Sequence, residues 1–187
     1  GGKFTHRYTS RKTKDDDDLP TCNLVLRKSV LDKLGGFNVD NWPGEDTYLS
    51  MQITKQLNMK MVYAPDVVVF HHRRSLFREH LKQIWAYGLH RGYFAKKYPE
   101  NSRKPIYFIP SLLVCGIITG LPLAFLNTVL MVVYLSLLAA YFTACLFEGI
   151  KTKNLKTAFF VSIGIPLTHI TYGIAFLRGL AIKNLKD

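Results

Sequence analysis

The chain has 187 residues and a formal net charge of +12, and hydrophobic residues make up 48% of it. Three scattered cysteines without a C-x-x-C pair exclude a disulfide-stapled secreted domain. Residues 1–105 hold 19 basic and 11 acidic residues, a net of +8, whereas residues 106–187 hold 6 and 2, a net of +4. The chain is therefore of mixed character on average, but its second part is strongly apolar.

The first 20 residues are polar, and four adjacent acids, Asp15 to Asp18, follow a lysine-rich run. One interpretation is an Asp-x-Asp metal site. Such a pair normally ends a buried apolar strand, so the polar run before it favours the other interpretation, a solvated loop whose acids neutralise their basic neighbours.

A short strand and a capped helix are expected next. The apolar run at residues 23–26 predicts the strand. Ser29 and Asp32 have the spacing of a capping box and predict a helix over residues 30–34. Gly35 suits the left-handed conformation that ends a helix.

An acidic pair opens the following predicted helix. Leu49, Ile53 and Leu57 repeat every four residues, which predicts an apolar stripe on a helix that begins near Glu45. Asp46 then lies in the first turn, where backbone N–H groups and the helix dipole favour its ionised form. On spacing alone, Asp46 is either an acid that merely stabilises the helix or a functional carboxylate.

Two β-rich runs within residues 61–70 are broken at Pro65 and lead into His71-His72-Arg73-Arg74. This cluster is either a polar strand exit that faces solvent or a site where an imidazole faces a metal or a diphosphate and the arginines contact phosphate. Adjacent strand residues point to opposite faces, so both histidines are not expected to serve one site. Zinc is not expected, because no second ligand pair lies at finger-like spacing.

Residues 76–98 have the pattern of a helix with apolar residues on one side and basic residues elsewhere. Interleaved basic and aromatic residues are also typical of nucleic-acid binding. Because an apolar run begins directly afterwards, an interfacial helix on anionic lipid explains this composition better. We therefore expect membrane lipids, and no nucleic acid, as partners.

Three runs of the second part are long and apolar enough to cross about 30 Å of hydrocarbon as helices, at residues 106–126, 128–147 and 157–177. A single run also fits a buried core helix, but three in succession favour membrane spans. Asn127 falls at a tight turn. Pro110, Pro122 and Pro166 predict kinks.

The positive-inside rule places the basic flanks at residues 91–104 and 151–156 in the cytoplasm. Three crossings then put the last basic residues, from Arg178 onward, outside, in conflict with the same rule. Either the tail is an exception or one run is re-entrant.

Several segments occur in a recognisable order: Asn23 through Arg27, Gly35-Gly36-Phe37, Gly44-Glu45-Asp46, Tyr63-Ala64-Pro65-Asp66, Val69-Phe70-His71-His72, His169-Ile170-Thr171-Tyr172-Gly173 and Leu177-Arg178-Gly179. Together, from about Thr21 onward, they resemble the C-terminal half of a membrane-bound family 2 glycosyltransferase of bacteria or archaea. No single segment is specific by itself.

The resemblance implies an α/β fold, the C-terminal part of a GT-A catalytic domain, over residues 1–75. The interfacial helix at 76–105 and an α-helical transmembrane region at 106–187 would follow. It also implies an inverting transfer of a sugar from a nucleotide-diphosphate donor to a lipid-linked or saccharide acceptor. The reaction would occur at the cytoplasmic face of the plasma membrane, in surface polysaccharide or glycolipid assembly of the cell envelope.

The resemblance also assigns roles to residues. Asp46 matches the family's catalytic base, and Glu45 and Trp42 are expected to contact the acceptor or support the loop. The diphosphate or metal contacts, with His71 as a tentative metal ligand, are His71, Arg73 and Arg74. The interfacial residues Gln83 and Trp85 keep only part of the Gln-x-x-Arg-Trp motif of processive synthases, which favours transfer of a single sugar.

The family's nucleotide-binding half, with the Asp-x-Asp that holds Mg²⁺ or Mn²⁺, is expected before residue 1. We therefore expect a fragment that is inactive alone. A non-catalytic membrane scaffold or subunit that binds anionic lipid is the alternative from another class. A transporter would need polar residues along several spans, and an interhelical hydrogen bond is the expected role of His169.

Overall fold

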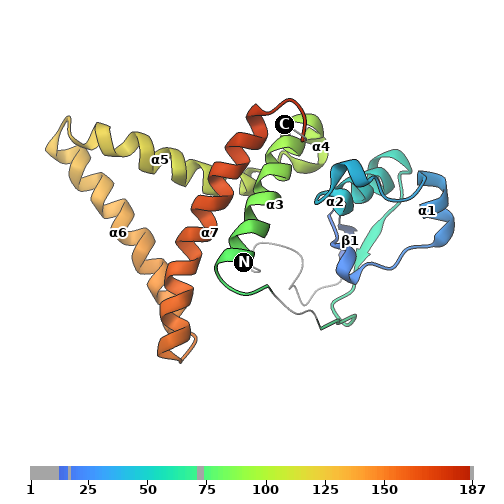
Figure 1. Cartoon of the computed structure of the whole chain (residues 1–187), viewed down its shortest axis with the longest axis horizontal. Helices are drawn as coiled ribbons and strands as arrows, with labels where there is room; N and C mark the ends of the chain where they lie inside the picture. The colour runs from blue at the N-terminus through green and yellow to red at the C-terminus, as the bar shows by residue number, and fades with distance from the viewer. Residues whose placement is uncertain (1–12, 17, 71–73, 186–187) are drawn as a thin grey trace. The chain divides into compact units, whose positions relative to one another are not determined.

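The computed structural model describes residues 13–16, 18–70 and 74–185, and the chain divides into two compact units at residue 73 (Figure 1). The first unit has α1 (Lys28–Leu34), α2 (Glu45–Met51) with a π-helical extension over Gln52–Gln56, and the strands β1 (Thr13–Asp16) and β2 (Met61–Tyr63). Short 3₁₀ turns lie at Thr21–Asn23 and Val39–Asn41.

The α/β, GT-A-type fold expected for residues 1–75 is wrong. In the described part of the chain, β1 and β2 form one small antiparallel sheet, with Thr13 opposite Tyr63, and the rest is helical or irregular. Residues 23–26 and 67–70, both expected as strands, have no ladder partner. A strand needs a neighbour that takes its backbone hydrogen bonds, and an apolar run does not supply one.

The two ends of α1 differ in how well the sequence predicted them. Gly35 adopts φ 73°, and its N–H donates to the carbonyls of Leu31 and Asp32, which confirms the predicted helix stop. The predicted Ser29 cap is wrong. The helix begins one residue earlier, at Lys28, and its N-cap Arg27 makes no side-chain capping bond.

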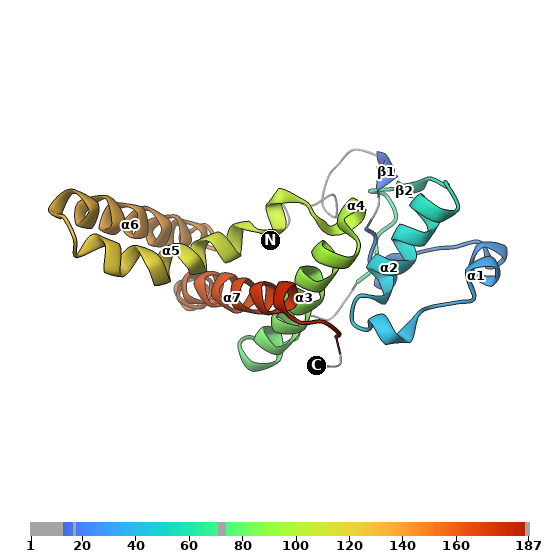
Figure 2. The same ribbon diagram turned by 90° about the horizontal axis from the view of Figure 1, so that it is seen from above.

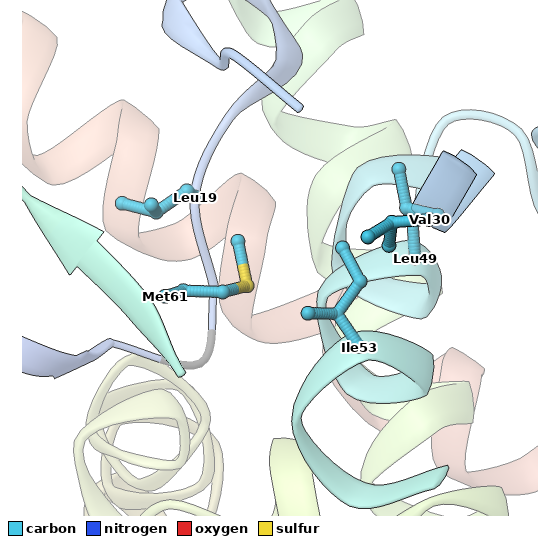
Figure 3. Packing of buried hydrophobic residues seen from close by; sticks show 5 residues of the cluster. All are labelled: Leu19, Val30, Leu49, Ile53 and Met61. Carbon is cyan, nitrogen blue, oxygen red and sulfur yellow. The ribbon is translucent and has the colours of Figure 1, made fainter. Parts of the chain in front are cut away.

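Five buried side chains form the core of the first unit (Figure 3). They come from the segment after β1, from α1, from α2 and its extension, and from β2: Leu19, Val30, Leu49, Ile53 and Met61. The core holds α2 against the sheet, so the first turn of α2 has a fixed support.

The second unit consists of helices. These are α3 (Arg78–Lys97), the short α4 (Pro99–Ser102), a 3₁₀ turn at Pro105–Tyr107, α5 (Ile109–Ala124), α6 (Thr128–Ile150) and α7 (Leu155–Ala181). The side chains of Asn127 and Asn154 cap α6 and α7 by accepting from the N–H groups of Val129 at 2.7 Å and Thr157 at 2.9 Å.

Helices α3 and α7 lie side by side and run in the same direction. His80, near the beginning of α3, has its Nε2 atom 3.0 Å from Oγ1 of Thr168 in the middle of α7, and at the ends of both helices Lys96 Nζ donates to the carbonyl of Leu180 at 3.0 Å. Between these points the backbones meet at glycines: a Cβ at Gly88 would come within 2.7 Å of the Tyr172 carbonyl, and one at Gly92 would overlap the Phe176 carbonyl. Small residues thus permit the close approach.

Helices α5, α6 and α7 outline a triangle in Figure 1, with turns at two corners. Helices α6 and α7 meet at the turn after Ile150, and α5 runs from the middle of α7 to the far end of α6. Seen from above, α5 lies along α6 (Figure 2). Two of the three, α6 and α7, are long and apolar enough to cross a membrane, whereas α5 with 16 residues is shorter.

Candidate functional site

The acidic pair lies in the first turn of α2, as the sequence predicted. Asp46 is half-buried, and its Oδ1 accepts the backbone N–H of Thr47 at 2.8 Å. The Thr47 hydroxyl donates in turn to Asp18 Oδ1 at 2.8 Å, and the N–H of Leu19 donates to Ser50 Oγ at 3.4 Å. The segment after β1 is thereby tied to the acidic turn and orients it.

Glu45 precedes Asp46 and is also half-buried. Its Oε2 atom is buried and has no hydrogen-bond partner among the described residues. A buried carboxylate oxygen costs free energy unless a donor meets it, so Glu45 is suited to accept a hydrogen bond from a bound hydroxyl group.

Trp42 lies in the loop just before α2 and exposes 69% of its surface, whereas its neighbour Asn41 is buried. A large aromatic ring held on an ordered loop gives a rigid apolar face with a polar N–H edge. Such a side chain suits contact with an amphipathic ligand. The acceptor contact expected for Trp42 stays a prediction.

A polar hollow of about 180 Å³ opens between the end of α1 and α2. Seven residues line it, from the glycine turn and from one face of α2: Leu34, Gly35, Gly36, Phe37, Asn38, Tyr48 and Gln52. Amides and a phenol at its wall can donate and accept hydrogen bonds, and Phe37 is partly exposed beside them. This combination fits a small ligand rich in hydroxyl groups.

Of the residues expected to contact the diphosphate or a metal, Arg74 lies within the described part of the chain. His71 and Arg73 lie outside the described residues, and Arg74 is an exposed residue at the start of the second unit. Among the described residues, no three His, Cys, Asp or Glu side chains come together to hold a metal ion.

Gln83 and Trp85 both lie on α3, and each contacts another residue of the second unit. Gln83 Nε2 donates to the Tyr87 hydroxyl at 2.8 Å, and the Arg178 guanidinium lies 6.0 Å from the centre of the Trp85 ring. The second contact joins α3 to α7 by a cation–π interaction.

Cations and aromatic rings gather around the C-terminal half of α3. Arg91 lies 4.5 Å from the Tyr107 ring centre, and Lys96 and Lys97 lie 5.7 and 5.3 Å from that of Tyr93. A hydrogen bond with Tyr93 raises the pKa of Lys97 above its ordinary value, so this amine stays charged at neutral pH. This composition is typical of a helix at a membrane surface.

Comparison with known protein families matches residues 19–150 to the family described as "Glycosyl transferase family group 2". The match covers more than two thirds of the chain and includes the acidic turn, α3, α5 and α6. The chain belongs to this family. Neither a curated protein nor a solved structure matches it. Membership of this family supports a function in glycosyl transfer, from a nucleotide-sugar donor to an acceptor.

Two features of the site were missed by sequence reasoning. The Thr47–Asp18 bond joins residues 29 positions apart, and local patterns carry no signal for such a pair. The sequence contains a weak signal for the hollow. Tyr48 and Gln52 are four residues apart, so they share one face of a helix, and the Gly35-Gly36 turn precedes them.

Proposed function

We propose that the chain is part of an inverting glycosyltransferase in which Asp46 is the general base. The observation that carries the proposal is the position of Asp46: a half-buried carboxylate in the first turn of α2, fixed by the Thr47 N–H, within the matched family region. The dipole of α2 favours its ionised form.

In the proposed reaction the acceptor hydroxyl gives its proton to Asp46 while its oxygen attacks the anomeric carbon of the donor sugar. The bond from that carbon to the diphosphate oxygen breaks, and the nucleoside diphosphate leaves with the bonding electrons. Attack from the side opposite the leaving group inverts the anomeric configuration. The Mg²⁺ or Mn²⁺ expected from the resemblance stays a prediction.

The acceptor is proposed to lie over the acidic turn, between Trp42 and the hollow beside α2. Glu45 offers an unpartnered acceptor atom, and Gln52 and Tyr48 offer further polar groups. A lipid-linked or saccharide acceptor, as used in surface polysaccharide or glycolipid assembly, presents the hydroxyl groups that such side chains bind.

We place the protein in the plasma membrane as a multi-pass protein, with the acidic turn on the cytoplasmic side. The support is the length and apolar character of α6 and α7, together with the cationic and aromatic residues on α3. Nucleotide-sugars are then available directly from the cytoplasm.

The proposal is tested with membranes that contain the full-length protein. Uridine- and guanosine-diphosphate sugars with a radiolabelled sugar are supplied, and label is measured in the lipid and polysaccharide fractions. Transfer with inverted configuration is expected. Retained configuration would contradict the mechanism, and binding to anionic vesicles without transfer from any donor would favour the non-catalytic membrane subunit.

A further inference from the structure

The C-terminal ends of α3 and α7 lie together at one end of the helical unit. Lys96, in the last turn of α3, donates through Nζ to the carbonyl of Leu180 at 3.0 Å and also to that of Ile182. Both carbonyls lie at the end of α7, where the helix dipole is negative, so a cation of α3 neutralises the end of its neighbour. In Figure 1, the turn between α6 and α7 lies at the opposite end of α7.

Cations gather at this shared end. Residues 91–104 and 178–185 hold seven basic residues and one acidic residue, a net of +6. Capping of α7 explains the position of Lys96 but not of the others. Four of these basic residues are exposed and form no ion pair within the described part of the chain, and we call them the cationic surface: Lys97, Arg103, Arg178 and Lys183.

Aromatic rings lie against two members of the cationic surface. Lys97 Nζ lies 5.3 and 5.4 Å from the ring centres of Tyr93 and Tyr98, and the Arg178 guanidinium lies 6.0 Å from that of Trp85. Both cations stay exposed beside these rings, so each can still contact an anion. Tyr and Trp beside basic residues are typical of the headgroup level of a membrane.

Exposed apolar side chains begin next to the cationic surface. The ring of Phe108, just before α5, lies 4.8 Å from the ring of Phe176, two residues before Arg178 on α7. Ile109 and Leu112, in the first turn of α5, expose 56% and 67% of their surface. Cations that border exposed apolar side chains match the boundary of a bilayer, where lipid phosphates lie beside hydrocarbon.

We propose that the cationic surface binds the phosphate groups of anionic membrane lipids, and that the end of α7 lies on the same side of the membrane as residues 91–104. The lipid partner follows from charge complementarity and from the apolar side chains that border the surface. The sequence instead predicted that the chain from Arg178 onward lies on the opposite side. The contacts of Lys96 with the end of α7 argue against that separation, and the proposal does not depend on glycosyl transfer.

Lipid selectivity tests the partner. Full-length protein is reconstituted in phosphatidylcholine vesicles that contain spin-labelled phosphatidylglycerol or spin-labelled phosphatidylcholine, and the protein-bound fraction of each label is measured. We expect a preference for the anionic lipid that falls by up to about fivefold in Lys183→Gln, the effect of one basic residue near an anionic surface, and that is kept in Lys183→Arg.

The control is Lys33→Gln, which removes an exposed lysine of α1. An unchanged preference in Lys183→Gln, or an equal loss in Lys33→Gln, would overturn the proposal. Loss of the preference on addition of inorganic pyrophosphate at constant ionic strength would assign the cationic surface to a soluble anion and would overturn it as well.

Side-specific labelling tests the position of the end of α7. Glu100→Cys and Asn184→Cys are made singly in the full-length protein, and an impermeant maleimide that carries polyethylene glycol is added to intact cells and to inside-out vesicles. Each reacted thiol adds one step of mass on a gel, so the native cysteines, of which Cys22 is exposed, do not interfere. We expect both new thiols to react in the same preparation. Reaction in opposite preparations would place the end of α7 across the membrane from residues 91–104 and overturn the proposal.

Discussion

At the scale of single residues, the candidate site depends on one turn of α2 and on what holds it. Thr47 links the turn in two directions, because its N–H binds Asp46 and its hydroxyl binds Asp18. Ser50 adds a second link to the segment after β1. A carboxylate fixed in this way loses little rotamer entropy when a substrate binds, which is what a positioned general base requires.

We expect Gln52→Ala to weaken acceptor binding, because it removes an amide from the wall of the hollow beside α2. The KM for the acceptor should rise about fivefold to tenfold, equivalent to about 1 kcal/mol for one lost hydrogen bond, with kcat little changed. Gln56→Ala is the matched control, an exposed amide one turn later. Equal acceptor KM values for the two variants would show that the hollow does not bind the acceptor.

Residue-level predictions succeeded where local geometry determines the outcome. Gly35 ends α1, Asp46 lies in the first turn of α2, and His169 makes the predicted interhelical hydrogen bond, with Tyr141 at 2.9 Å. The Ser29 cap failed, although its spacing was correct, because the extended conformation ends at Arg27 and Ser29 already lies inside the helix. Asp18 was assigned to a solvated loop, and only tertiary structure shows its bond to Thr47.

At the scale of elements, the second unit depends on the contact between α3 and α7. Gly88 and Gly92 on α3 face a stretch of α7 that contains Ala175 and Gly179. The two residues of each helix are four positions apart, so they lie on one face and leave it flat. This spacing of small residues is visible in the sequence. The amphipathic pattern of residues 76–98 predicted the helix, but periodicity alone did not predict its partner.

Gly92→Ala should destabilise the helical unit, because the new Cβ overlaps the Phe176 carbonyl. The expected loss is about 1–3 kcal/mol, the range for an overpacked contact. Gly116→Ala is the control: nothing lies within 4 Å of its Cβ position, and alanine favours a helix by about 1 kcal/mol over glycine. Thermal unfolding in detergent should therefore show a lower Tm for Gly92→Ala alone. Equal Tm values would mean that α3 and α7 do not pack as described.

At the scale of the whole molecule, the chain combines a small unit that carries the acidic turn with a unit of long helices. The lengths of the apolar runs predicted helices in the second part of the chain, whereas the change in composition lies near residue 105 and the two units divide at residue 73. The α/β expectation failed because apolar runs such as residues 67–70 show where a strand is possible, whereas a sheet also needs partner strands. Of the described residues, only β1 and β2 meet that need.

The exposed apolar surface of α6 and α7 predicts an integral membrane protein. Only 6% and 28% of their most apolar 18-residue stretches are buried within the molecule, so we expect lipid to cover the remainder. After alkaline carbonate washing, the full-length protein should stay in the membrane pellet. Release into the supernatant, as for a peripheral protein used as the control, would show that these helices do not span the bilayer.

Replacement of Asp46 by Asn tests the central claim most directly. Asp46→Asn keeps the shape of the side chain and removes the base, and Asp32→Asn, an exposed acid on α1, is the control for the same chemical change in the same unit. In full-length protein we expect Asp46→Asn to lower turnover by a factor on the order of 10² or more, the range for a general base, with donor affinity and Tm close to those of the control. Near-normal transfer by a folded Asp46→Asn variant would contradict the mechanism and leave this carboxylate as a stabiliser of the first turn of α2.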